Sequence, residues 1–99
     1  MLTRLYVVVS PEEESIVEEV IDELRNLQPK FSYSPFREQP SLANCLEFYG
    51  TANLNEKEID TFLSQINNDL DGDRDDCSAY GFNTKMFHKN VYYIQFQIQ

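Results

Sequence analysis

Hydrophobic and polar residues alternate along two stretches of this chain, one near its beginning and one near its end. The first stretch, Leu2–Val9, would place two sets of side chains on opposite faces of a strand: Leu5, Val7 and Val9, against Arg4, Tyr6 and Val8. The second stretch, Val91–Ile98, alternates in the same way. A period of two residues is typical of a strand with one buried face, so both stretches predict β-strands.

Apolar residues at helical spacing follow the first predicted strand. Their positions are Ile16, Val17, Val20, Ile21, Leu24 and Leu27. Ahead of them, Ser10 can cap a helix, Pro11 suits the first helical position, and Glu13 can complete a capping box. We therefore expect an amphipathic helix that begins just after Ser10 and ends at Gln28, with its acidic side chains facing solvent.

The same signals occur a second time further along the chain. Asn55 can cap a helix, and Glu58 stands at the spacing that a capping box needs. The residues that follow form one apolar stripe: Ile59, Phe62, Leu63, Ile66 and Leu70. This pattern predicts a second amphipathic helix.

The segment between the two predicted helices contains weaker strand signals. Residues 30–41 include several aromatic side chains, but Pro35 and Pro40 each remove a backbone donor, so we expect an edge strand or an irregular arm. Residues 44–49 form a better strand, which Gly50 is expected to end.

Beyond the second helix, we expect a loop and two strands. The segment 69–76 is rich in aspartate and contains a glycine, which is typical of a solvated loop. The segments 77–83 and Val91–Ile98 predict two strands that are joined around residues 85–90.

The resulting order is β-α-β-β-α-β with an extra strand near the C-terminus. This order resembles the split β-α-β arrangement of ferredoxin-like domains, which implies an α+β fold with both helices on one face of an antiparallel sheet. A chain of 99 residues that is 41% hydrophobic is expected to form one domain, residues 1–99. The face without helices would carry Tyr6, Cys45, Tyr49 and Tyr93.

Charge is the strongest signal in the composition. The chain has 17 acidic and 8 basic residues, which gives a formal net charge of -9. Most of the acidic residues form two blocks: Glu12, Glu13, Glu14, Glu18, Glu19, Asp22 and Glu23 in the first, and Asp69, Asp71, Asp73, Asp75 and Asp76 in the second. Such a field repels nucleic acid and anionic lipid and attracts basic surfaces and cations. We therefore expect neither direct nucleic-acid binding nor membrane binding.

The second acidic block partly resembles the start of a calcium-binding loop. Asp69, Asp71 and Gly72 have the expected spacing. However, Arg74 stands where a calcium loop has a hydrophobic residue, and Ser78 stands where it has a bidentate glutamate. A solvated turn is the favoured interpretation, and weak cation binding stays open as the alternative. We expect no resident metal and no cofactor.

No sequence pattern points to catalysis. His88 is the single histidine, it lies between lysines, and no acidic residue is near it in the sequence. Cys45 and Cys77 lack the spacing of a zinc or redox motif, and we expect free thiols in a cytoplasmic protein. We therefore expect a protein that is not an enzyme; an active site assembled from His88, Tyr80 and distant acidic residues is an alternative.

The leading functional hypothesis is a non-catalytic acidic protein that docks on a basic partner. Its sharper form is nucleic-acid mimicry, in which carboxylates replace phosphates in the groove of a nucleic-acid-binding protein, as in phage-encoded inhibitors of restriction or CRISPR systems. The residues expected to bind the partner are Glu12, Glu14, Glu18, Glu19, Asp22, Asp71, Asp73 and Asp75.

The alternative hypothesis is a structural or regulatory domain that forms a homodimer through its sheet. The segment Val91–Ile98 carries no charged side chain, so as an edge strand it could pair with its own copy.

Overall fold

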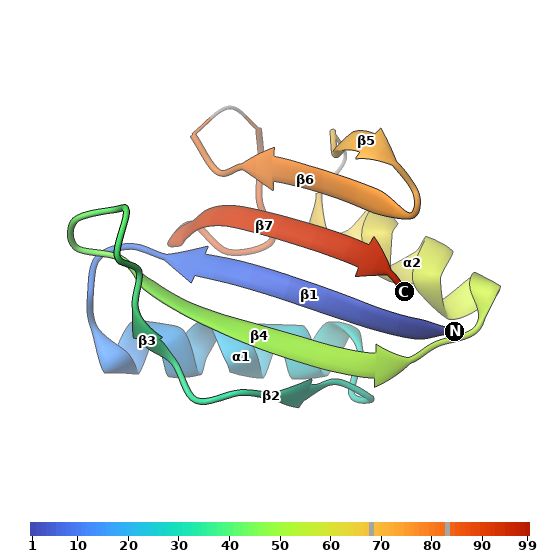
Figure 1. Ribbon diagram of the computed structural model, residues 1–99, viewed down its shortest axis with the longest axis horizontal. Coiled ribbons are helices and arrows are strands. Elements are labelled where there is room, and N and C mark those ends of the chain that lie inside the picture. The colour runs from blue at the N-terminus through green and yellow to red at the C-terminus, as the bar shows by residue number, and fades with distance from the viewer. Residues whose placement is uncertain (68, 83) are drawn as a thin grey trace.

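A seven-stranded antiparallel sheet carries both helices on one of its faces, as the computed structural model of the protein shows (Figure 1). The structure describes residues 1–67, 69–82 and 84–99. Its elements, in chain order, are β1 (Leu2–Val9), α1 (Glu14–Leu27), β2 (Ser32–Tyr33), β3 (Arg37–Glu38), β4 (Leu46–Asn53), α2 (Glu56–Ile66), β5 (Asp71–Asp73), β6 (Asp76–Tyr80) and β7 (Val91–Ile98).

The order of the strands in the sheet differs from their order along the chain. The strands follow one another as β2-β4-β1-β7-β6-β5, and β3 pairs with another part of β4. All of the pairs between named strands are antiparallel, including β1 with β4, which α1 connects. The expected α+β class is confirmed, whereas the ferredoxin-like topology is not confirmed and the number of strands differs from the expected one.

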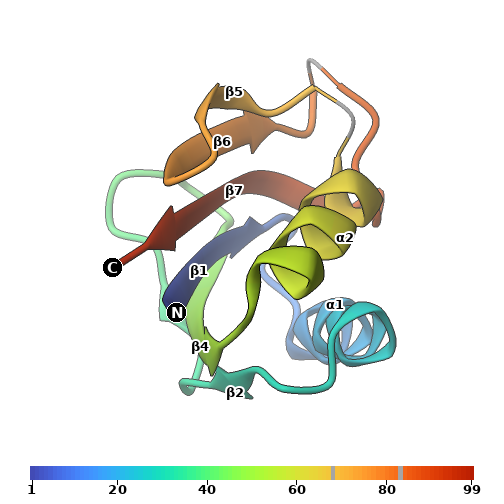
Figure 2. The same cartoon turned by 90° about the vertical axis from the view of Figure 1, so that its right-hand side faces the viewer.

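The core lies between the sheet and the two helices, which lie side by side in Figure 2. The inward face of β1 is the one that the alternation predicted, and its residues Leu5, Val7 and Val9 are fully buried. The helices contribute Val17, Val20 and Leu24 from α1, and Ile59, Phe62 and Ile66 from α2. No helix in the described residues is long and apolar enough to span a membrane.

Helix α2 begins as predicted, but α1 does not. Asn55 and Glu58 form the expected capping box, because each side chain accepts a hydrogen bond from the backbone N–H of the other. Helix α1 begins only at Glu14, and its N-cap residue has no side-chain hydrogen bond. The predicted cap, Ser10, is held elsewhere, because its N–H donates to the Asn90 carbonyl and its own carbonyl accepts from the Asn90 side chain, both at 3.0 Å. Helix α1 ends as predicted, with Gln28 as its C-cap.

The expectation that Gly50 ends the third predicted strand is wrong. Strand β4 runs through Gly50 to Asn53. The rings of Phe31 and Tyr33 cover this glycine so closely that an added Cβ would lie 3.0 Å from the Tyr33 ring. Two aromatic rings from the arm before β4 (residues 30–41) therefore fill the space of the absent side chain, so the strand continues through Gly50.

The expected aspartate loop is instead a β-hairpin. Strands β5 and β6 pair from Asp73 opposite Asp76 to Asp71 opposite Ser78. Gly72 adopts φ 110°, and an added Cβ there would lie 2.4 Å from the Asp76 carbonyl oxygen. The hairpin is joined to the sheet, because the N–H of Ile98 donates to the Asp75 carbonyl at 2.9 Å. Tertiary pairing therefore places these charged residues on an edge strand, where their side chains stay in solvent.

The remaining strands agree with the sequence in part. The strand predicted over 77–83 runs over Asp76–Tyr80, and Asn83, the last residue of the predicted segment, lies outside the described residues. Strand β7 has the predicted bounds but pairs with β1 on one side and β6 on the other. The condition for dimerisation through β7 is therefore not met, because β7 is not an edge strand.

Candidate functional site

The exposed side of α1 carries a dense set of carboxylates. Glu14, Glu18 and Asp22 follow one another at intervals of four residues, and Glu19 and Glu23 form a second row beside them. All of these side chains are exposed. Residues four apart on a helix are neighbours on its surface, so both rows run along the helix.

The carboxylate density of this helix is close to the phosphate density of one nucleic-acid strand. Helix α1 has 14 residues with five carboxylates and one guanidinium, that of Arg25. At about 1.5 Å per residue the helix is about 21 Å long, which gives about one carboxylate per 4 Å. One strand of duplex DNA carries a phosphate about every 3.4 Å along the axis.

Two basic groups approach the acidic face of α1. Arg25 lies 3.5 Å from Asp22, and both side chains are mostly exposed. His88 Nε2 lies 3.7 Å from a Glu19 oxygen, so the fold brings an acidic residue that is distant in the sequence next to the histidine. His88 Nδ1 accepts a hydrogen bond from the Asn90 N–H at 3.1 Å, so the ring is oriented by its own loop. This contact joins the loop before β7 to α1.

Glu12 lies beside a second carboxylate before the helix begins. A hydrogen bond to the Glu38 side chain, together with the negative charge of that group, raises the pKa of Glu12. The two carboxylates border a hollow of about 340 Å³ that residues 39–45 complete. Glu12 is therefore less suited to a fixed negative charge than the carboxylates of α1.

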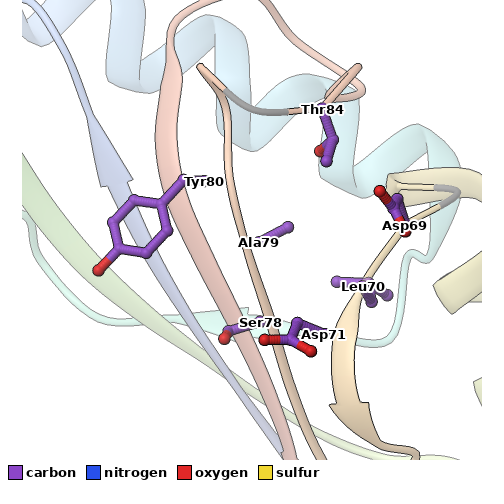
Figure 3. A pocket seen from close by; sticks show the side chains of 7 residues that line it. All are labelled: Asp69, Leu70, Asp71, Ser78, Ala79, Tyr80 and Thr84. Carbon is purple, nitrogen blue, oxygen red and sulfur yellow. The ribbon is translucent and has the colours of Figure 1, made fainter.

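The second group of predicted residues lies on the hairpin. Asp71 and Asp73 belong to β5 and Asp75 to the turn, and all three are exposed. Asp71 also lines a hollow of about 320 Å³ with six other residues: Asp69, Leu70, Ser78, Ala79, Tyr80 and Thr84 (Figure 3). Leu70 and Ala79 supply its apolar surface, and Asp69 and Asp71 its charge. Asp73 and Asp75 are not among the residues that line it.

The two acidic blocks do not form one group. Strand β5 is at one edge of the sheet, whereas α1 lies on the side of α2 that is farther from β5 (Figure 2). The acidic residues of α2 are largely neutralised, since Glu58 pairs with Lys30 at 2.7 Å and Asp60 with Arg74 at 2.9 Å. Among the described residues, no three His, Cys, Asp or Glu side chains are grouped so that they could hold a metal ion.

Sequence reasoning missed a buried polar network on the opposite face of the sheet. Glu47 is 3% exposed and accepts hydrogen bonds from Tyr6 Oη at 2.7 Å and Arg37 Nε at 2.5 Å. The Gln39 side chain donates to the Tyr6 hydroxyl at 3.3 Å. The arm that contains β3 therefore covers this carboxylate. No local signal identifies it, because its partners come from two other segments, β1 and the arm.

This network makes stability at alkaline pH depend on Tyr6. Burial, followed by the hydrogen bond to Glu47, raises the pKa of Tyr6 to about 12, although the Gln39 hydrogen bond acts in the other direction. Between pH about 10 and 12 the unfolded chain loses this proton while the folded protein keeps it, so stability falls as pH rises. The substitution Tyr6→Phe removes this titration along with the hydrogen bond. We expect it to destabilise the protein near pH 7, and the difference from wild type to narrow towards pH 12.

Urea unfolding of both proteins across this pH range measures the difference directly. A constant difference between the two stability curves would contradict the assignment, because it would mean that Tyr6 has the same pKa in the folded and the unfolded protein.

The same face carries six aromatic rings in continuous contact, which we call the aromatic cluster: Tyr6, Tyr49, Tyr80, Phe82, Tyr92 and Tyr93. The sequence predicted the positions of Tyr6, Tyr49 and Tyr93 on this face. It did not predict Tyr92, which joins the cluster at a register shift where Val8 pairs with Tyr93 and Val9 with Val91. Such a bulge redirects a side chain that regular alternation would turn inward.

The cluster becomes more exposed along its length. Tyr6 and Tyr49, with centroids 4.9 Å apart, are partly buried near the Glu47 network. At the other end, Tyr80 is 44% exposed and Phe82 is 69% exposed. The acidic side of α1 and the outer end of the aromatic cluster are thus two separate exposed surfaces. Comparisons of this chain with protein-family models, with curated proteins and with solved structures found no match.

Proposed function

We propose that this protein is a non-catalytic acidic binding protein that docks on a basic protein. The observation that carries the proposal is the exposed carboxylate density of α1, about one per 4 Å of helix. A surface of this kind attracts cationic surfaces, accelerates their association and makes the complex sensitive to salt.

The sharper form of the proposal is mimicry of nucleic acid. The carboxylates of α1 would occupy positions that phosphates take in the groove of a nucleic-acid-binding protein, as an inhibitor of the restriction or CRISPR type does. Their spacing along the helix, close to the phosphate spacing of one DNA strand, supports this form. The buried free thiols Cys45 and Cys77 fit the reducing cytoplasm that we propose as the site of action.

Neutralising α1 tests the proposal. The variant carries Glu18→Gln, Glu19→Gln, Asp22→Asn and Glu23→Gln, all at exposed positions. We expect its fold to be unchanged and its binding to the basic partner to be lost, because the substitutions keep the side-chain shapes and remove the charge. The partner is captured from a nuclease-treated bacterial lysate on the immobilised wild-type protein and eluted in a salt gradient.

The decisive measurement is competition. The captured protein should bind nucleic acid, and wild type but not the α1 variant should displace that nucleic acid. The matched control neutralises the hairpin instead, with Asp71→Asn, Asp73→Asn and Asp75→Asn, and shows whether the second block contributes. Equal displacement by wild type and the α1 variant would remove α1 from the binding surface.

The alternative proposal is a homodimer formed through the sheet, and the exposed end of the aromatic cluster favours it. In this form the faces of two sheets would pack together, since β7 lies inside the sheet. Sedimentation at increasing protein concentration distinguishes the two proposals. A stable dimer that lacks affinity for basic proteins would support the alternative.

A further inference from the structure

We propose that the outer end of the aromatic cluster, formed by Tyr80, Phe82 and Tyr92, binds arginine side chains of a basic partner protein. The carboxylates of the adjoining hairpin would pair with the same guanidinium groups. This inference rests on the proposed function and names both a second contact surface and the residue type that it recognises.

The three rings form a fixed surface. The ring centroids of Tyr80 and Phe82 lie 5.3 Å apart, and those of Phe82 and Tyr92 lie 5.8 Å apart. Between Tyr80 and Phe82, the Gly81 N–H donates to the Tyr92 carbonyl at 2.8 Å. An added Cβ at Gly81 would lie 2.0 Å from the Val91 carbonyl oxygen, so only glycine allows this approach. The backbone thereby holds Phe82 against Tyr92 while most of its ring is exposed.

The strand register places one carboxylate, that of Asp71, on the same face as these rings. Tyr80 pairs with Tyr93, and Ser78, two residues earlier on β6, pairs with Asp71. Residues two apart on a strand share a face, so Asp71 lies on the same face as Tyr80, about 7 Å along the strand and one strand spacing of about 5 Å across. Figure 3 shows Asp71 beside Ser78 in the hollow that Tyr80 also lines. The Tyr80 ring itself points away from Asp71 in Figure 3, so an arginine stacked on this ring would extend across Ser78 to interact with the carboxylate.

The other end of the cluster already holds a guanidinium group. The Arg4 side chain lies over the Tyr49 ring, with its Cζ 4.3 Å from the centroid. Arginine stacks on aromatic rings and pairs with carboxylates in a planar, forked geometry, whereas the lysine ammonium group is more strongly hydrated and stacks less well. An arginine from another protein can therefore stack on Tyr80 and Phe82 in the way that Arg4 stacks on Tyr49.

Charge argues for a basic partner rather than a second copy of the chain. Each copy carries a formal net charge of -9, and Asp71 lies on the same face of the sheet as Tyr80. Two such faces would bring like charges together, and a nucleic acid would be repelled for the same reason.

The test uses two probes, an arginine homopeptide and a lysine homopeptide of equal length, titrated into the full-length protein at fixed salt. We expect the arginine peptide to bind roughly three- to tenfold more tightly. Ring-proton NMR signals of Tyr80 and Phe82 should shift during the arginine titration. The variant Phe82→Ala should lose most of the preference, and it keeps the fold because this ring is 69% exposed.

Two control variants separate this inference from the proposed function. Leu2→Ala removes another exposed apolar side chain outside the cluster and should leave the preference unchanged. The α1 variant should weaken both peptides and keep the preference for arginine. Equal binding of the two peptides, or an unchanged preference in Phe82→Ala, would overturn the inference and leave the proposed function intact. Binding of neither peptide would overturn both, and a dimer that Phe82→Ala dissociates would assign the rings to a second copy instead.

Discussion

Phe62→Ala is expected to destabilise the protein by about 3–5 kcal/mol. Phe62 is 1% exposed on the inner side of α2. Its ring centroid lies 5.1 Å from that of Phe31 and 6.0 Å from that of Phe96, so it joins the arm before β2 to the central strand β7. Truncation removes the apolar contacts and leaves a cavity that these two rings can fill only in part.

Urea unfolding, followed by circular dichroism, gives the free energy of unfolding for this comparison. The matched control is Phe82→Ala, the same substitution at a ring that is 69% exposed, which should change stability by no more than about 0.5 kcal/mol. Similar losses at the two positions would show that Phe62 does not have the central packing role assigned to it.

Glu47→Ala is expected to cost about 2–3 kcal/mol, from lost hydrogen bonds to a charged group and from the space left under the arm. The Glu47 carboxylate is almost fully buried and accepts hydrogen bonds from Tyr6 and Arg37. Removing it leaves the Tyr6 hydroxyl without its acceptor and the Arg37 guanidinium without its ionic partner, whereas the backbone pairing of β3 with β4 remains. Glu23→Ala, on the exposed face of α1, is the control and should stay within about 0.5 kcal/mol of wild type.

A double-mutant cycle measures how much of this loss of stability comes from the hydrogen bond between Tyr6 and Glu47. If the hydrogen bond between Tyr6 and Glu47 carries much of it, Glu47→Ala and Tyr6→Phe together should cost less than the sum of the two single changes, by about 1 kcal/mol or more. Strict additivity would mean that the two side chains stabilise the fold independently.

Sequence reasoning succeeded where local signals and tertiary packing agree. Strand β1 has the predicted hydrophobic face, and Asn55 caps α2 as its spacing with Glu58 indicated. Helix α2 buries most of its predicted stripe but ends at Ile66, before Leu70. In both elements the hydrophobic period of the sequence and the tertiary packing favour the same structure.

The errors arose where a distant segment decides the local structure. Gly50 reads as a strand end until the rings of Phe31 and Tyr33 replace its missing side chain. Ser10 has the sequence signal of a helix cap, but Asn90, far along the chain, binds its backbone N–H and carbonyl and holds it away from the helix. A single sequence contains no record of such pairings, so the hairpin of β5 and β6 was likewise expected as a loop.

The two candidate binding surfaces also differ in how far the sequence predicts them. The exposed acidic face of α1 follows from helical spacing, because charges opposite an apolar stripe must face solvent. The exposed rings could be predicted only in part, since a bulge in β7 redirects Tyr92 and a close backbone approach at Gly81 positions Phe82. The separation of the two acidic blocks depends on the strand order, which periodicity does not encode.

The central position of β7 has a consequence for synthesis of the protein. Until residues 91–98 have left the ribosome, β1 and β4 can pair on one side and β5 and β6 on the other, but nothing joins the two halves of the sheet. The nascent chain then presents β1 as an open edge with an apolar face, a state that favours chaperone binding or aggregation. Because Thr3 pairs with Ile98, the sheet closes through contacts between residues far apart in the chain, and we expect folding to be slow for a protein of this size.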